Sequence, residues 1–123
     1  LLELLQRGTL LGLLKTKVKA IKQMAAPEKM FLDNPNLLLA FNRNPEIGTI
    51  RETFFYNQVS RTTDVYYPKK GDFQINDKIL IEVGGADKSF NQIKDIPNSY
   101  LAIDNVEFGR GNRIPLWKFG FLY

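Results

Sequence analysis

Apolar residues just beyond the middle of the chain alternate with a period of two, which is typical of β-strands. The alternating odd-numbered positions are Phe73, Ile75, Ile79, Ile81 and Val83. All of them share one face only if the connecting loop has an odd number of residues, and residues 76–78 supply such a loop. The pattern therefore predicts a hairpin in which Phe73 pairs with Ile81 and Asp72 lies opposite Glu82.

Three segments show helical patterns. Apolar residues recur every three or four positions over residues 49–59, and this spacing predicts the longest helix. A shorter helix is predicted over residues 36–41, with Asn34 as its N-cap and Pro35 at its first position. The leucine-rich residues 1–7 are interpreted as the last turns of a helical linker.

The remaining apolar runs predict a sheet. Short strands are expected at residues 29–32, 65–67, 72–75, 78–83 and 100–103. Lysine occupies every second position from Lys15 to Lys19, and this alternation favours an exposed strand or loop edge whose charges prevent pairing with another chain. The alternative is a strip of lysines that contacts phosphates. The pattern as a whole predicts an α/β fold. In this fold a mixed sheet flanked by helices occupies residues 27–123, after a helical and basic lead-in over residues 1–26.

Composition narrows the possible chemistry. The 123 residues include no cysteine and no histidine, which excludes disulfides, a thiol nucleophile, a Cys/His zinc site and an imidazole base. The net charge of +4 is compatible with nucleic-acid binding without requiring it. The apolar start is too short and too polar to span a membrane, so no membrane partner is expected. Because the chain begins at Leu1, we expect it to be a piece of a longer cytoplasmic protein.

Three carboxylates are candidates for chemistry. In the predicted register the Cβ atoms of Asp72 and Glu82 would lie about 5 Å apart, and their charges would repel unless a cation or a proton lay between them. A structural pairing of one of them with Lys70 or Lys88 is the alternative. Glu52 lies on the apolar stripe of the longest predicted helix, where a carboxylate is buried against a partner, directed at a site, or solvated.

A second group of candidates is basic. Its members are Lys69, Lys70, Arg110 and Arg113, together with the nearby aromatic residues Tyr66, Tyr67 and Phe108. Basic side chains beside aromatic rings can contact phosphates and stack on bases, so this group is a candidate nucleic-acid surface. The alternative is that these are solvated loop charges beside aromatic residues of the core.

Several segments resemble a known family. They are residues 34–38, 47–55, 71–73, 82–85, 90–93 and 114–123. These segments are similar to the uncharacterised carboxy-terminal domain of bacterial and archaeal AAA-type P-loop ATPases, and the resemblance covers nearly the whole chain. Glu52, Asp72 and Glu82 together resemble the acids of the PD-(D/E)xK nuclease core.

The resemblance implies a restriction-endonuclease-like core whose parent protein carries an N-terminal ATPase domain as its partner. In a working nuclease of this type, Asp72 and Glu82 would hold Mg²⁺, and Glu52 would orient the attacking water or a second metal ion. The lysine expected two residues after Glu82 is replaced by Gly84, so Lys88 is the candidate substitute. The chain contains no G-x-x-x-x-G-K-[ST] motif, so ATP would bind only through the ATPase domain.

Three functions remain open at this point, and with them the question of whether the chain is an enzyme. The expected one is an accessory domain that has lost its lysine and binds DNA or RNA, or couples a partner to the ATPase. The alternatives are an active Mg²⁺-dependent phosphodiester nuclease and a pure interaction or oligomerisation domain.

Overall fold

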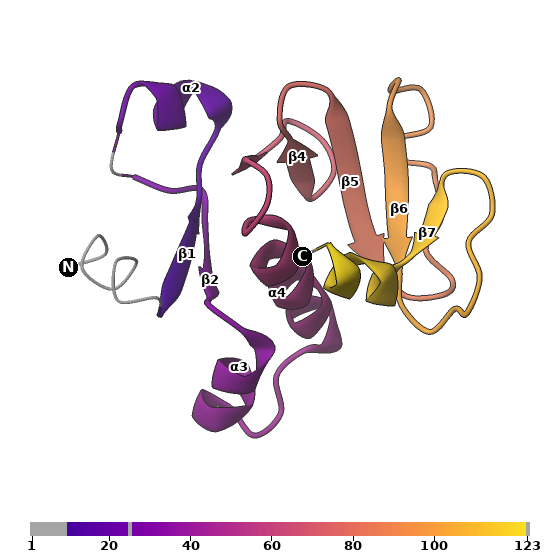
Figure 1. The fold of residues 1–123 in the computed structure, drawn as a ribbon, viewed down its shortest axis with the longest axis horizontal. Helices are drawn as coiled ribbons and strands as arrows, with labels where there is room; N and C mark the ends of the chain where they lie inside the picture. The colour runs from indigo at the N-terminus through magenta and orange to yellow at the C-terminus, as the bar shows by residue number, and fades with distance from the viewer. Residues whose placement is uncertain (1–9, 25, 123) are drawn as a thin grey trace.

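The computed structural model describes residues 10–24 and 26–122. Its larger sheet has five strands in the order β3 to β7 (Figure 1). They are β3 (Val65–Tyr66), β4 (Phe73–Ile75), β5 (Ile79–Gly84), β6 (Ser99–Ile103) and β7 (Arg113–Pro115). The β3–β4 and β4–β5 pairs are antiparallel, whereas β5–β6 and β6–β7 are parallel. The sheet is therefore mixed, as the sequence predicts.

A separate two-stranded sheet pairs β1 (Leu11–Leu14) with β2 (Lys29–Leu32) in antiparallel orientation. It joins segments on either side of residue 26, where the sequence pattern divides the lead-in from the domain. The helices among the described residues are α2 (Lys17–Ile21), α3 (Pro35–Phe41), α4 (Ile47–Val59) and the 3-10 helix η1 (Leu116–Phe121).

Helix α4 lies between the two sheets and packs on both (Figure 1). Its Phe55 ring stacks on Phe73 of β4 with centroids 4.9 Å apart, and its Tyr56 ring stacks on Phe31 of β2 at 5.1 Å. These aromatic contacts join the small sheet, the helix and one face of the large sheet. The main core on this face contains Leu14, Phe31, Phe55, Val59, Phe73, Ile75, Ile81, Val83, Ala102 and Leu116.

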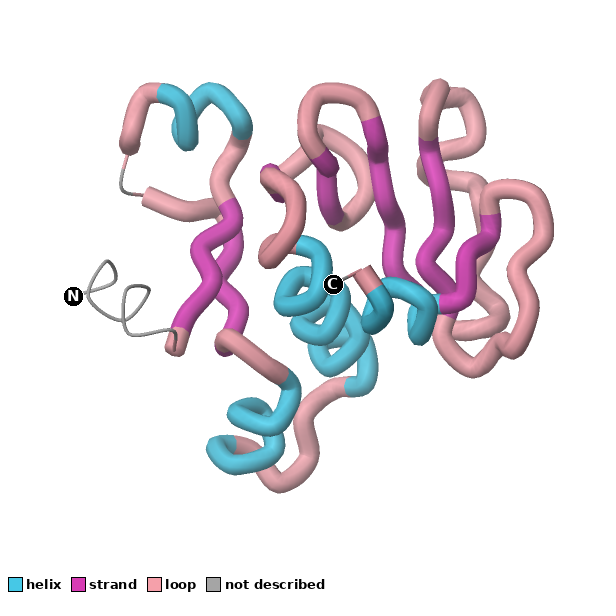
Figure 2. The backbone as a smooth tube through the Cα atoms, in the orientation of Figure 1, coloured by secondary structure: helices cyan, strands magenta, loops and turns pink. Residues whose placement is uncertain are grey.

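The opposite face of the large sheet has a smaller core, formed by Leu80, Leu101 and Ile103 with Ile93 from the connection between β5 and β6. That connection contains turns rather than a regular helix, and it is drawn as loop in Figure 2. Both faces of β5 are thus covered, and its residues 80–83 are all buried.

Most local predictions agree with the structure. Phe73 pairs with Ile81 as the register predicts, and α3 begins at Pro35 behind Asn34, whose side chain accepts from the Leu37 N–H at 3.2 Å. The strand β7 was not predicted. The predicted helix over residues 1–7 lies outside the described residues.

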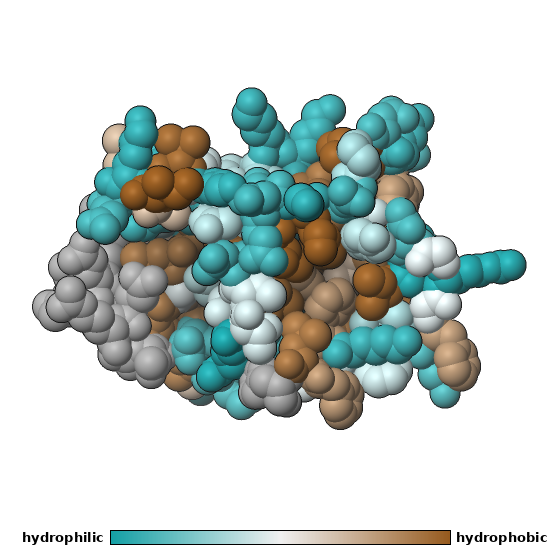
Figure 3. Space-filling model, turned by 45° about the horizontal axis from the view of Figure 1, so that its top comes forward, coloured by the Kyte–Doolittle hydropathy of each residue, from teal (hydrophilic) through white to brown (hydrophobic). Residues whose placement is uncertain are grey.

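The exposed strand or edge predicted around Lys15, Lys17 and Lys19 is wrong. Residues 17–21 form helix α2, because the Thr16 hydroxyl caps the helix by accepting from the Lys19 N–H at 3.2 Å. Helix α2 leaves Val18 and Ile21 exposed, and Figure 3 shows hydrophobic atoms over this end of the molecule among hydrophilic side chains. None of the helices in the described part of the chain has the length and hydropathy needed to cross a bilayer.

Candidate functional site

Glu82 is the most deeply buried of the predicted acids, with 2% of its surface exposed. It lies on β5 between the hydrophobic residues Ile81 and Val83, so its carboxylate needs partners from elsewhere in the chain. The ammonium nitrogen of Lys88 lies 2.8 Å from Glu82 Oε1. The side-chain amide of Gln92, turned with its nitrogen toward the carboxylate, donates to Oε1 and also to Oε2, the latter at 3.2 Å. Both oxygens of Glu82 therefore have donors within the protein.

Lys88 reaches Glu82 by passing over a glycine. A Cβ atom at Gly84 would lie 2.7–2.8 Å from Cβ, Cγ and Cδ of Lys88, closer than real Cβ contacts allow. Gly84 stands where the nuclease pattern has its lysine. The absence of a side chain at this position is what lets the lysine stem cross the end of β5.

Asp72 is held beside Glu82 by backbone hydrogen bonds. Its N–H donates to the Ile81 carbonyl at 3.0 Å, and its Oδ2 accepts from the Val83 N–H at 2.7 Å. These two bonds join Asp72 to the residues on either side of Glu82. The carboxylate of Asp72 therefore accepts from a main-chain N–H at the point where the β4–β5 ladder ends.

Glu52 approaches the site from α4 and has a partner of its own. Lys29, on β2, places its ammonium nitrogen 2.9 Å from Glu52 Oε2. The pKa of Lys88 is raised above its ordinary value, chiefly by its hydrogen bond with Glu82, although burial opposes the shift. The charges of Glu82, Asp72 and Glu52 all add to the increase in the Lys88 pKa. Glu82, Asp72, Glu52 and Lys88 are called the acidic cluster below; within it Lys88 contacts Glu82, whereas Asp72 and Glu52 act on Lys88 through their charge.

This cluster differs from an open metal site. Within residues 10–24 and 26–122, no group of three or more acidic side chains is arranged to hold a metal ion. Mg²⁺ requires near-octahedral oxygen coordination, whereas the carboxylates of Glu82 and Glu52 already contact ammonium groups of the chain. The fit of Mg²⁺ between Asp72 and Glu82 therefore requires Lys88 to move away.

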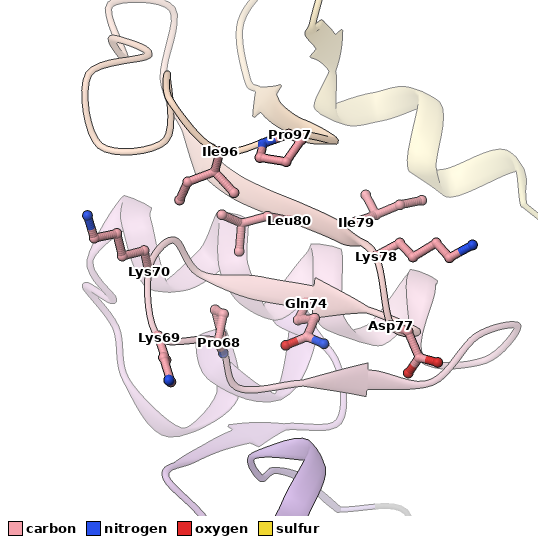
Figure 4. A pocket seen from close by; sticks show the side chains of 10 residues that line it. All are labelled: Pro68, Lys69, Lys70, Gln74, Asp77, Lys78, Ile79, Leu80, Ile96 and Pro97. Carbon is pink, nitrogen blue, oxygen red and sulfur yellow. The ribbon is translucent and has the colours of Figure 1, made fainter.

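Two of the predicted basic residues lie next to the acidic cluster. Lys69 and Lys70 are exposed in the connection from β3 to β4, directly before Gly71 and Asp72. They border a hollow of about 540 Å³ on the side of the sheet that carries Gln74 and Leu80 (Figure 4). Because Leu80 and Glu82 are two positions apart on β5, they belong to the same face of the sheet.

The other two basic residues belong to the opposite edge of the sheet, on or just before β7, and Arg113 also reaches the loop of the acidic cluster. The guanidinium of Arg113, on β7, donates to the backbone carbonyls of Lys88 and Ala86, each at 2.9 Å. Arg113 thereby holds the loop that carries Lys88. Arg110 is exposed, and its backbone forms an isolated antiparallel β-bridge with the backbone of Arg113. The four predicted basic residues do not form one continuous surface.

Two partners in the site were not found by sequence reasoning. Lys29 pairs with Glu52 across 23 residues, and Arg51 pairs with Asp104 across 53 residues, with its Nε 2.9 Å from Oδ2. The Arg51 guanidinium also lies about 3.0 Å from where a Cβ on Gly85 would stand. No spacing within the sequence indicates such contacts, because each joins two elements through the tertiary fold.

Comparisons with known protein families, with curated proteins and with solved structures find no match for this chain. The resemblance to the ATPase-associated domain therefore depends on the sequence segments alone.

Proposed function

We propose that this chain is a nucleic-acid-binding domain with a nuclease-like core, acting as an accessory domain of a AAA-type ATPase. One observation carries the proposal. Lys69 and Lys70 are exposed beside a hollow on the sheet face that also carries Glu82, and the same segment continues into Asp72. Cationic side chains next to a preserved acidic cluster are the arrangement expected where a phosphate backbone passes a former cleavage site.

The element order supports a nuclease-like core. Helix α4 is followed by the antiparallel strands β3, β4 and β5, and β6 then adds in parallel beside β5. The acids that resemble the PD-(D/E)xK pattern come from α4, from the residue directly before β4 and from β5. The charges of all three acids favour the protonated form of Lys88 and raise its pKa.

The contacts of the acids favour binding over cleavage. Lys88 neutralises Glu82, and Lys29 neutralises Glu52. A metal-dependent nuclease needs those carboxylates to bind the cation that activates water. A domain that only holds nucleic acid needs the positive charge of the neighbouring surface, which Lys69 and Lys70 supply.

Fluorescence anisotropy with labelled DNA and RNA tests the proposal. The Lys69→Glu/Lys70→Glu double variant is compared with Lys22→Glu/Arg43→Glu, which changes the net charge equally at two exposed sites away from the hollow. We expect wild-type affinity to fall roughly tenfold between about 50 and about 200 mM salt, and the first variant to lose most of its binding. Equal losses in the two variants, or no binding by the wild type at low salt, would reject the proposal.

An active Mg²⁺-dependent nuclease is the second candidate. The hydrogen bonds of Asp72 to the residues on either side of Glu82 favour it, because they keep the two carboxylates at one end of β5, where they could share a cation once Lys88 releases Glu82. Calorimetric titration with Mg²⁺ and Mn²⁺, beside an Asp72→Ala control, separates the two functions. Heat of binding that is lost in Asp72→Ala, together with cleavage of single- or double-stranded substrate, would establish the nuclease. Salt-insensitive association with an ATPase core, without retention of nucleic acid, would instead indicate a pure interaction domain.

A further inference from the structure

We infer that the hollow beside Lys69 and Lys70 accepts an unpaired base of a single-stranded nucleic acid, while the two lysines contact the neighbouring phosphates. This inference rests on the proposed function and specifies the class of nucleic acid. It concerns the hollow alone and does not involve the acidic cluster.

The lining of the hollow suits a flat, largely apolar group. Its walls include the side chains of Pro68, Leu80, Ile96 and Pro97, which are labelled in Figure 4. Its volume of about 540 Å³ is within the range of small-molecule sites. A phosphate alone would not use such a surface, whereas the face of a nucleobase would be removed from water against it.

The charge around the hollow suits an anion attached to that apolar group. Lys69, Lys70 and Lys78 contribute positive charge to its lining. The acid in the lining, Asp77, forms an ion pair with Lys17 of α2, so its charge is compensated. A nucleotide within a strand combines an apolar base with phosphates on either side, and it matches both properties of the hollow.

The fold explains why the hollow lies next to the lysines. The connection between β5 and β6 covers Leu80 and Leu101 on this face through Ile93 and Ile96, and the hollow opens beside Gln74 of β4. Gly71 adopts a φ of +78°, and a Cβ there would lie 3.2 Å from the Leu80 side chain. This left-handed backbone, which glycine adopts without strain, brings the segment of Lys69 and Lys70 down against Leu80.

The concave shape argues for a single strand. In a duplex each base is stacked and paired, so its face cannot enter a hollow unless the base is first flipped out at a cost of a few kcal/mol. Bases of a single strand are released at much lower cost, and proteins bind them by covering their faces. Gln74 adds a polar group to the lining; its Nε2 donates to the Asn76 carbonyl at 3.2 Å, which fixes the amide.

Binding of matched oligonucleotides tests the inference. The intact chain is titrated at one salt concentration with single-stranded DNA and single-stranded RNA of about 12 nucleotides, with a duplex of equal length, and with an abasic strand of equal length. We expect the single strands to bind about tenfold or more tightly than the duplex and the abasic strand. Equal affinity for DNA and RNA single strands would agree with recognition of the base alone. A preference for one of them would identify that nucleic acid as the ligand.

A variant of the hollow provides the second arm. Gln74→Glu places a negative charge in the lining with little change of shape, and Asn44→Asp makes the same change of charge at an exposed site outside the lining. We expect Gln74→Glu to weaken single-strand binding severalfold and Asn44→Asp to leave it unchanged. If the abasic strand binds as well as the intact strand while the lysine variant still weakens binding, the base site is rejected and the proposed function survives. Failure to bind any strand would reject both.

Discussion

The ammonium nitrogen of Lys88 lies 2.8 Å from Oε1 of Glu82, and the lysine stem reaches it across Gly84. Glu82 is 2% exposed, whereas the Lys88 side chain is 33% exposed. The carboxylate therefore depends on the lysine more than the lysine depends on the carboxylate, because only the buried partner would be left without solvation if the pair were broken.

Replacing Lys88 with Met is expected to destabilise the protein. The methionine keeps most of the apolar stem but leaves the Glu82 carboxylate buried without its cation. We expect a loss of about 2–4 kcal/mol in the free energy of unfolding, since the lysine of this pair is only partly buried. Urea denaturation measures the loss. Lys94→Met, at an exposed position, is the control and should change stability by less than about 0.5 kcal/mol; a similar change in both variants would contradict the role of the pair.

The same pair predicts a loss of stability at alkaline pH. Because folding raises the pKa of Lys88 above its ordinary 10.5, the native state holds this proton more tightly than the unfolded state. The contribution is complete below pH 10.5 and is lost as the pH rises through the folded-state pKa. The difference in unfolding free energy between wild type and Lys88→Met should therefore shrink as the pH rises above 10.5.

Tyr56 also titrates at alkaline pH, and its contribution cancels when the unfolding free energy of Lys88→Met is subtracted from that of the wild type. Burial raises the pKa of Tyr56 above 10, and Tyr56 is present in both proteins. Unfolding free energies are measured by urea titration from about pH 8 upward. A difference that stays constant to the highest pH at which the protein remains folded would show that Lys88 gains nothing from Glu82.

Gly84→Ala tests the path of the lysine stem. The new methyl group would overlap the first three carbons of the Lys88 side chain, so the stem has to move and the ammonium is drawn away from Glu82. We expect a destabilisation of roughly 1–3 kcal/mol. In a Lys88→Ala background most of the stem is gone, so the cost of Gly84→Ala should be smaller. An equal cost in both backgrounds would place the effect in the backbone rather than in the lysine.

Local pattern was sufficient to predict the centre of this fold. The alternation on either side of residues 76–78 sets the register of β4 and β5, because a shift by one residue would move Phe73 and Ile81 out of the core. The cap of α3 was also predictable, since Asn34 acts on a group three residues away. These features depend on neighbours in sequence.

The rest depends on contacts that sequence spacing does not encode. The partner of Glu52 is Lys29, which comes from the other sheet. The alternation around Lys17 predicted a strand or loop edge where the structure has helix α2. The Thr16 hydroxyl caps this helix, and the cap outweighs a short pattern with a period of two. Strand β7 is three residues long and ends at Pro115, and it is recognisable only through its pairing with β6.

Asn34→Ala is expected to weaken the start of α3. The Asn34 side chain satisfies the Leu37 N–H, and alanine leaves that donor without its cap. We expect a loss of about 1 kcal/mol in the free energy of unfolding. Asn36→Ala is the matched control, because Asn36 is exposed in the first turn and its replacement should be neutral or slightly stabilising. Thermal denaturation of the two variants gives the comparison, and equal midpoints would contradict the capping role.

Two glycine-to-alanine substitutions should have opposite signs. Gly12 is buried on β1 against the ring of Tyr56, and a Cβ at this position would overlap that ring. The ring cannot retreat freely, because it stacks on Phe31 at 5.1 Å and its hydroxyl contacts the Leu13 carbonyl at 3.4 Å. Gly12→Ala is therefore expected to cost roughly 1–3 kcal/mol by forcing β1 away from α4.

Gly48 offers the matched case in open space. It lies in the first turn of α4, is exposed, and a Cβ there would meet nothing within 4 Å. Alanine restricts the unfolded chain and is the better helix former, so Gly48→Ala should stabilise the protein by up to about 1 kcal/mol. Urea denaturation of both variants decides the point. If Gly12→Ala were as well tolerated as Gly48→Ala, the packing of the two-stranded sheet against Tyr56 would not contribute to the stability of the fold.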